Sequence, residues 1–276
     1  MKRYFLDTPY GQIHYAVEGS GDPVILLHQT ARSTSEYARV IPILAKKYKT
    51  IAMDTLGFGD SDKPSAPTAI AVYAETVKML MDEIGVEKAN VVGRHTGSFI
   101  AIEVAAAYPE RVDKLVLSEP HYHDERMRKG EEVQALLKTW VKFWVDWLKD
   151  GTKEDGSHFV EAWQVLKEHD ETMPPDLLNR IILDYLKAGG GGTYAYNAIF
   201  SYPMDQRLPL IQCPTLIMWG TKDIVTFDLG GPVEKTNEII KRRKVVYIED
   251  ATFVAADRMP EKFTQPIIEF LENPGV

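Results

Sequence analysis

The chain has 276 residues, of which 45% are hydrophobic and 26% charged, a composition typical of a globular protein with a buried core. Its length fits one large α/β domain or a core domain with an insertion. The net charge of −8 argues against a nucleic-acid-binding protein, which needs a basic face. The only cysteine is Cys213, so an intrachain disulfide is excluded.

Neither a secretion signal nor a membrane span is predicted. The N-terminal segment reaches Asp7 before an apolar stretch of signal length can form, and no run of about 18 apolar residues follows. We therefore expect a cytoplasmic protein whose partner is a small-molecule substrate, with neither nucleic acid nor membrane as a partner. The sequence leaves the oligomeric state open, a homodimer included.

Strands and helices alternate through the first part of the chain. Alternating apolar residues over 3–7 and 12–17 predict a hairpin. Apolar runs then predict buried strands, and segments with a period of 3.6 predict helices. The expected strands lie at 24–27, 50–53, 89–92 and 115–117, and the expected helices at 34–46, 70–84 and 97–108. This alternation is typical of a parallel sheet covered by helices.

The pattern changes after Glu119. Residues 120–208 are helical in character and rich in Trp and Tyr, with no buried strand among them. Strands are again expected at 215–219 and 244–248, with helices at 232–241 and 260–271. The sequence therefore predicts a mostly parallel, eight-stranded sheet flanked by helices. Residues 1–119 and 209–276 would form the core domain, and 120–208 a helical cap, or lid, inserted after the sixth strand.

The segment Gly93-Arg94-His95-Thr96-Gly97 joins an expected strand to an expected helix. Gly-x-Ser-x-Gly at such a junction holds a nucleophilic serine on a strained turn, where the glycines relieve crowding. Here both glycines are present, and a histidine occupies the central position. The turn is therefore expected, without its usual nucleophile.

Four motifs occur in an order known from one superfamily. His28-Gln29-Thr30 follows the third strand, 53–64 follows the fourth, 93–97 follows the fifth, and Trp219-Gly220-Thr221-Lys222-Asp223 follows the seventh. With these motifs the chain resembles the α/β-hydrolase superfamily over nearly its whole length. Fold alone does not establish function.

The resemblance implies a catalytic triad that this chain lacks in its ordinary form. His95 stands in place of the nucleophilic serine, and Phe253 in place of the C-terminal catalytic histidine. Serine chemistry needs a base, which phenylalanine cannot supply. What remains is a His95–carboxylate pair, because imidazole can act as base or nucleophile near neutral pH. Asp223 holds the usual acid position and is favoured over Glu119, which follows the sixth strand.

The resemblance also implies an oxyanion hole made by backbone N–H groups, here those of Thr30 and Thr96. Gln29 replaces the usual glycine after His28. We expect Gln29 to narrow the site or to hydrogen-bond a substrate carbonyl, and His28 chiefly to hold its loop.

The expected substrate-binding residues are Gln29, His28, Trp144 and Phe253. No metal or cofactor is expected. Glu119, His121 and His123 form a conceivable metal-ligand set, although a loop entering the cap explains them as well. Ser98 as a displaced nucleophile is disfavoured because it lacks an evident base.

The sequence thus favours a cofactor-independent enzyme that hydrolyses a small apolar carbonyl compound, namely an ester, a lactone or an activated C–C bond. His95, oriented by Asp223 or Glu119, would be its base or nucleophile. Lyase, decarboxylase or cofactor-free oxygenase chemistry is an alternative, since a base and an oxyanion hole suffice for it. A third alternative is an inactive relative that binds a small ligand, with His95 only filling space.

Overall fold

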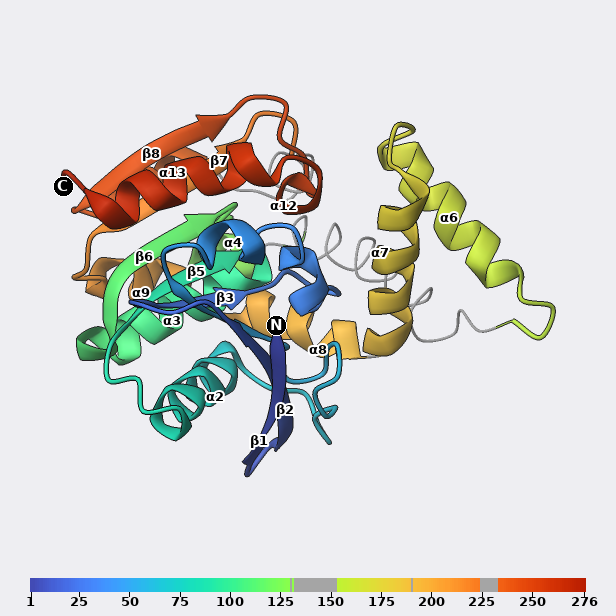
Figure 1. The fold of residues 1–276 in the computed structure, drawn as a ribbon, viewed down its shortest axis with the longest axis horizontal. Coiled ribbons are helices and arrows are strands. Elements are labelled where there is room, and N and C mark those ends of the chain that lie inside the picture. The colour runs from blue at the N-terminus through green and yellow to red at the C-terminus, as the bar shows by residue number, and fades with distance from the viewer. Residues whose placement is uncertain (130, 132–152, 190, 224–232) are drawn as a thin grey trace.

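The computed structural model describes residues 1–129, 131, 153–189, 191–223 and 233–276. The described strands form a single sheet in the order β1-β2-β4-β3-β5-β6-β7-β8, which Figure 1 shows at the centre of the molecule. The strands are β1 (Lys2–Thr8), β2 (Gly11–Glu18), β3 (Pro23–Leu27), β4 (Lys49–Met53), β5 (Ala89–Arg94), β6 (Val112–Ser118), β7 (Thr215–Gly220) and β8 (Arg243–Ile248). Pairing is antiparallel for β1–β2 and β2–β4 and parallel from β4 to β8. The predicted eight-stranded, mostly parallel sheet is confirmed.

Helices connect the strands and cover the sheet. The core helices are α1 (Ile41–Leu44), α2 (Ile70–Glu83), α3 (Thr96–Ala107), α11 (Val233–Ile239), α12 (Ala255–Arg258) and α13 (Pro260–Glu272). Those between β6 and β7 are α4 (Glu125–Lys129), α6 (Ser157–His169), α7 (Pro175–Ala188), α8 (Gly191–Ser201) and α9 (Met204–Arg207). Short 3-10 turns lie at Thr34–Tyr37, Pro109–Arg111 and Leu208–Leu210. No described helix has the length and apolar character needed to cross a membrane.

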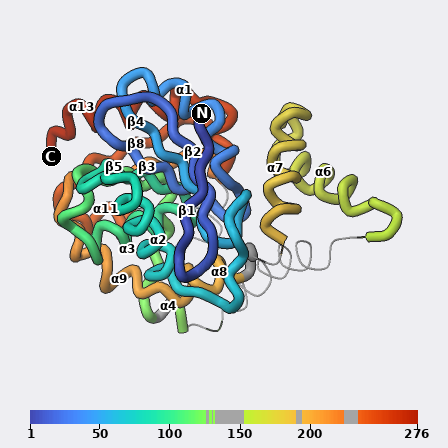
Figure 2. Tube along the Cα trace, turned by 60° about the horizontal axis from the view of Figure 1, so that its bottom comes forward, coloured from blue at the N-terminus to red at the C-terminus, as the bar shows by residue number. Residues whose placement is uncertain are grey.

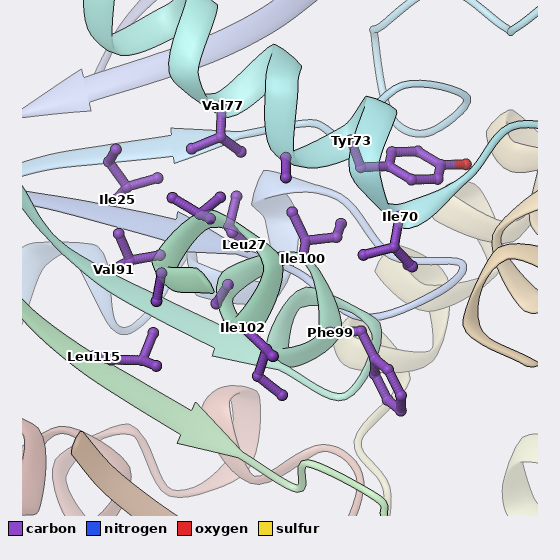
Figure 3. Close-up of a cluster of buried hydrophobic side chains, with 14 of the residues drawn as sticks. Ile25, Leu27, Ile70, Tyr73, Val77, Val91, Phe99, Ile100, Ile102 and Leu115 are labelled. Carbon is purple, nitrogen blue, oxygen red and sulfur yellow. The ribbon is translucent and has the colours of Figure 1, made fainter. Parts of the chain in front are cut away.

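Helices bury both faces of the sheet. Successive side chains of a strand point to opposite faces, so a strand such as β3 contributes to two apolar clusters. In β3, Ile25 and Leu27 belong to an apolar cluster shared with α2 and α3. Val24 and Leu26 belong to a second cluster, shared with α1 and α13. Figure 3 shows the first cluster, in which Ile100 of α3 and Val77 of α2 pack with residues of the strands. The continuous apolar run at 24–27 therefore reflects burial on two sides.

One predicted helix is wrong. A single helix was expected over 34–46, but the chain forms a 3-10 turn at Thr34–Tyr37 and then the separate α1. Pro42 lies in the first turn of α1. Proline has no N–H and clashes with the preceding turn, so it begins a helix better than it continues one.

Helices α6 and α7 stand to one side of the sheet in both views (Figures 1 and 2). An apolar cluster joins them to loops of the core: Ala31, Phe58, Phe253 and Val254 pack with residues of α6 and α7 that include Ala162, Leu166, Leu177, Leu178 and Ile181. Arg32 adds a buried ion pair, with its Nε 2.9 Å from Oδ2 of Asp184 in α7. The segment after β6 is thus helical where it is described, and it packs on loops that follow β3, β4 and β8.

Candidate active site

The turn between β5 and α3 places His95 at the carboxyl edge of the sheet. His95 caps α3 with φ 44° and ψ −112°, a conformation that costs energy for a residue with a side chain. A Cβ atom on Gly97 would lie 2.0 Å from the carbonyl oxygen of Leu27, and one on Gly93 would lie 2.2 Å from that of Gly97. Both glycines are therefore required sterically, as the sequence motif predicts.

Asp223 reaches His95 from the loop after β7. Its Oδ2 lies 3.0 Å from Nε2 of His95, and the carboxylate is fully buried. Burial alone would raise the pKa of Asp223, but the charge and hydrogen bond of His95, together with Arg94, outweigh it and lower the pKa to about 2. At neutral pH an ionised carboxylate therefore accepts a hydrogen bond from Nε2 of His95.

Glu119 lies elsewhere. Its Oε1 accepts a hydrogen bond of 2.5 Å from the backbone N–H of Gly220, and its own N–H donates to the carbonyl of Met218 at 3.0 Å. Glu119 therefore ties the ends of β6 and β7 together, close to where the chain leads to Asp223. Of the two candidate carboxylates, the structure brings Asp223 to His95.

A second histidine contacts His95, and sequence reasoning missed it in this role. Nδ1 of His95 lies 3.1 Å from Nε2 of His121, and both rings are buried. Burial and the neighbouring charge of His95 lower the pKa of His121 well below its ordinary value. The signal was available, because β5 and β6 are parallel neighbours, and residues just after their carboxyl ends must lie close together.

Arg94 is buried next to this pair. Its guanidinium is 3.4 Å from Glu36 and 3.6 Å from Asp223, with side chains almost fully buried. Its Nη2 also donates to the carbonyl of Thr252 at 3.0 Å. These contacts make Arg94 a structural ion-pair partner.

Gln29 differs from its expected role. Its Nε2 donates to Glu36 and to the carbonyl oxygen of Phe253, each at 2.9 Å. Both amide hydrogens are thus used within the protein, so the expectation that Gln29 donates to a substrate carbonyl is not met in this structure. Its side chain instead holds the loop in which the family's C-terminal histidine would lie.

His28 and the two threonines organise the loop after β3. Nδ1 of His28 lies 2.8 Å from the carbonyl of Gln29, and Nε2 accepts from the N–H of Thr55 at 3.0 Å. These bonds leave His28 a loop-holding residue. Thr30 donates its backbone N–H to Oγ1 of Thr96 at 3.2 Å, and the two hydroxyls lie 2.6 Å apart. Thr30 and Thr96 are therefore neighbours, and the N–H of Thr30 is bonded to Thr96.

Of the two remaining predicted pocket residues, the structure describes Phe253. Phe253 is 9% exposed, packs in the cluster that joins α6 and α7 to the core, and meets the ring of His169 edge-on at 6.0 Å. Phe253 thus makes an apolar contact with these helices. Trp144 lies outside the described residues.

Two disfavoured alternatives gain nothing from the structure. The hydroxyl of Ser98 lies 2.8 Å from the carbonyl oxygens of both Gly93 and Ser118, so it braces the turn. Among the described residues, the one group of three potential metal ligands is His14, Asp54 and Asp60. There the guanidinium of Arg3 already pairs with Asp60 and donates to Nε2 of His14.

Comparison with known proteins agrees with this architecture. The family model for the alpha/beta hydrolase fold matches residues 22–254. The chain therefore belongs to the α/β-hydrolase family.

Proteins named as hydrolases are among those similar to this chain. A 2-hydroxy-6-oxo-6-phenylhexa-2,4-dienoate hydrolase of Comamonas testosteroni is 29% identical over 79% of this chain and 77% of its own. An uncharacterized protein of Mycobacterium tuberculosis is 33% identical over 76% of this chain, but the match covers only 64% of that protein. The structure of an esterase from Thermogutta terrifontis superposes with a TM-score of 0.76 at 22% identity, covering 100% of both chains, a likeness of fold.

Proposed function

We propose that the protein is a cofactor-independent hydrolase of a small apolar carbonyl compound, and that it uses a His95–Asp223 pair in place of the Ser-His-Asp triad. The observation that carries the proposal is the 3.0 Å contact between Nε2 of His95 and Oδ2 of Asp223. A carboxylate in this position fixes the imidazole tautomer and stabilises the imidazolium formed when the ring accepts a proton. It supports a histidine acting as base, with water as the nucleophile, or as the attacking group itself.

The turn that carries His95 supports a chemical role over a packing role. The positive φ of 44° is strained for histidine, and the two adjoining glycines leave no space for side chains. A histidine needed only to fill space does not require such a turn. Strain at this position is consistent with a side chain held at the edge of the sheet for reaction.

The oxyanion would be held by the backbone N–H groups of Thr30 and Thr96. Thr96 is the first residue of α3, where the helix dipole favours negative charge. The N–H of Thr30 donates to Oγ1 of Thr96, so a substrate oxyanion would take the place of that hydroxyl. The developing negative charge would then gain two preorganised donors.

Residues 120–208 would act as the cap that covers the site, with residues 1–119 and 209–276 as the catalytic core. The apolar packing of Phe253 and Ala31 against α6 and α7 supports this arrangement. Phe253 would form an apolar wall beside the substrate. Esters, lactones and activated C–C bonds share the carbonyl carbon that this machinery needs, and the Comamonas relative is named for hydrolysis of a phenylhexadienoate.

The test is a substrate panel run in water labelled with oxygen-18. The panel contains p-nitrophenyl acetate, γ-butyrolactone and a 2-hydroxy-6-oxo-dienoate, and the masses of the products are measured by mass spectrometry. A hydrolase incorporates one labelled oxygen into the carboxylic acid product. Product without label would indicate lyase or decarboxylase chemistry. Ligand binding without any product, even after long incubation, would indicate a binding protein and overturn the proposal.

A further inference from the structure

We propose that His121 is the third member of the reacting group, so that Asp223, His95 and His121 form a relay whose proton-accepting nitrogen is Nδ1 of His121. The inference rests on the proposed function, in which the neutral imidazole of His95, paired with Asp223, takes up a proton during the reaction. It changes which atom of the protein accepts that proton.

The tautomer of His95 is fixed from the side of Asp223. A carboxylate can only accept hydrogen bonds, so Nε2 of His95, at 3.0 Å, carries the hydrogen. The lone pair of an uncharged His95 is therefore on Nδ1. That nitrogen faces Nε2 of His121 at 3.1 Å, so it is not free to receive a proton from a substrate or a water molecule.

The tautomer of His121 then follows from that of His95. Two lone pairs cannot share a hydrogen bond, so Nε2 of His121 must donate to Nδ1 of His95. The lone pair of His121 is left on Nδ1. This nitrogen is buried and has no hydrogen-bond partner among the described residues, while the residue as a whole is 7% exposed. An unpartnered buried acceptor is costly, and such a cost is expected where the group has a role in the reaction.

The surroundings favour a neutral His121 before the reaction. Burial and the adjacent His95 disfavour its charged form, with His123 acting in the same direction and Asp223 against it. Phe99 packs near its ring, at a centroid distance of 6.5 Å. Among the described residues, the charged groups near the relay include Arg94, which is paired with Asp223 and Glu36, and Glu119, which is bound to the N–H of Gly220.

The proton movement balances within the three residues. Nδ1 of His121 takes a proton from the reacting water or substrate. The hydrogen on Nε2 of His121 passes to Nδ1 of His95. The positive charge then lies on His95, next to the Asp223 carboxylate that stabilises it. On product release the same steps run in reverse, and the proton leaves from Nδ1 of His121.

The first test reads the tautomers and needs no substrate. Nitrogen-15 histidine spectra of the whole protein at pH 7 should show Nε2–H for both His95 and His121, with a coupling across the N–H···N bond between them. In Asp223→Asn, an amide N–H donated to Nε2 of His95 should reverse both rings to Nδ1–H. A wild-type His121 that carries its hydrogen on Nδ1, or a missing coupling between the rings, would overturn the relay.

The second test uses turnover of p-nitrophenyl acetate as the probe, or of whichever panel substrate gives product. His121→Gln keeps an N–H donor for His95 but cannot accept a proton, so kcat should fall by roughly 10² or more. It should also lose the pH dependence of the wild type. His158→Gln is the control for the same change of residue, because His158 lies on α6 and its ring contacts Phe159, and it should keep the wild-type kcat.

The outcomes separate the relay from the proposed function. If His95→Ala abolishes turnover and His121→Gln retains it, the relay is wrong and the hydrolase stands. If the predicted tautomers are found and no panel substrate is turned over, the arrangement of the three residues stands and the hydrolase fails.

Discussion

The link between α7 and the core gives a quantitative prediction about stability. Asp184 of α7 is buried and accepts hydrogen bonds from Nε of Arg32 at 2.9 Å and from the hydroxyl of Ser33 at 2.6 Å. Arg32 is also buried, and its Nη1 keeps a second partner, Asp257, at 2.9 Å. Removing one partner of a buried ion pair typically costs about 3–5 kcal/mol. Because Asp257 still faces Arg32, we expect Asp184→Ala to cost about 3 kcal/mol, near the lower end.

The same helix offers a control. Asp176, at the start of α7, pairs with Arg39 at 3.1 Å, with side chains 62% and 45% exposed. Exposed pairs contribute at most about 1 kcal/mol, so Asp176→Ala should be nearly silent. Urea unfolding followed by circular dichroism gives both free energies of unfolding. Equal losses in the two variants, or a loss below about 1 kcal/mol for Asp184→Ala, would refute the view that buried charge holds α7 on the core.

The strained turn and the buried carboxylate give two further predictions. Gly97→Ala should lower the free energy of unfolding by about 3 kcal/mol or more, since its Cβ would meet the Leu27 carbonyl at 2.0 Å. The control Gly85→Ala, at a position with φ +66° and open space around it, should lower it by about 1 kcal/mol. Thermal melts compare the two variants, and similar losses of stability would contradict the steric argument. The pKa of Asp223 is lowered from 3.8 to about 2, so its contribution of about 2 kcal/mol is present above pH 3.8 and lost as the pH falls through 2. Acid unfolding of Asp223→Asn should lack this part of the pH dependence, and identical pH profiles for the two proteins would count against an ionised Asp223.

The fold could be predicted because its signals are local. Continuous apolar runs such as 24–27 mark strands buried on both faces, and Gly93 and Gly97 mark a turn that admits no side chain. The helix expected over 34–46 failed where Pro42 begins a new segment. Periodicity alone does not register the missing N–H of a proline.

The site could be predicted only in part. The family positions of His95 and Asp223 identify a pair that the fold brings to 3.0 Å. The parallel pairing of β5 and β6 places the residues that follow them at one edge of the sheet, but which of these residues meets His95 depends on the strand register and on the direction of a loop. The bonds of Gln29 to Glu36 and Phe253 likewise join segments far apart in the chain.

The central claim is that His95, held by Asp223, takes part in the reaction as its base or as the attacking group. Its most direct test is the kcat of His95→Ala on the substrate that the wild type hydrolyses, with circular dichroism to show that the fold is kept. Loss of a positioned base predicts a fall in kcat of roughly 10²–10⁴. A folded His95→Ala protein that retains the wild-type kcat would contradict the account.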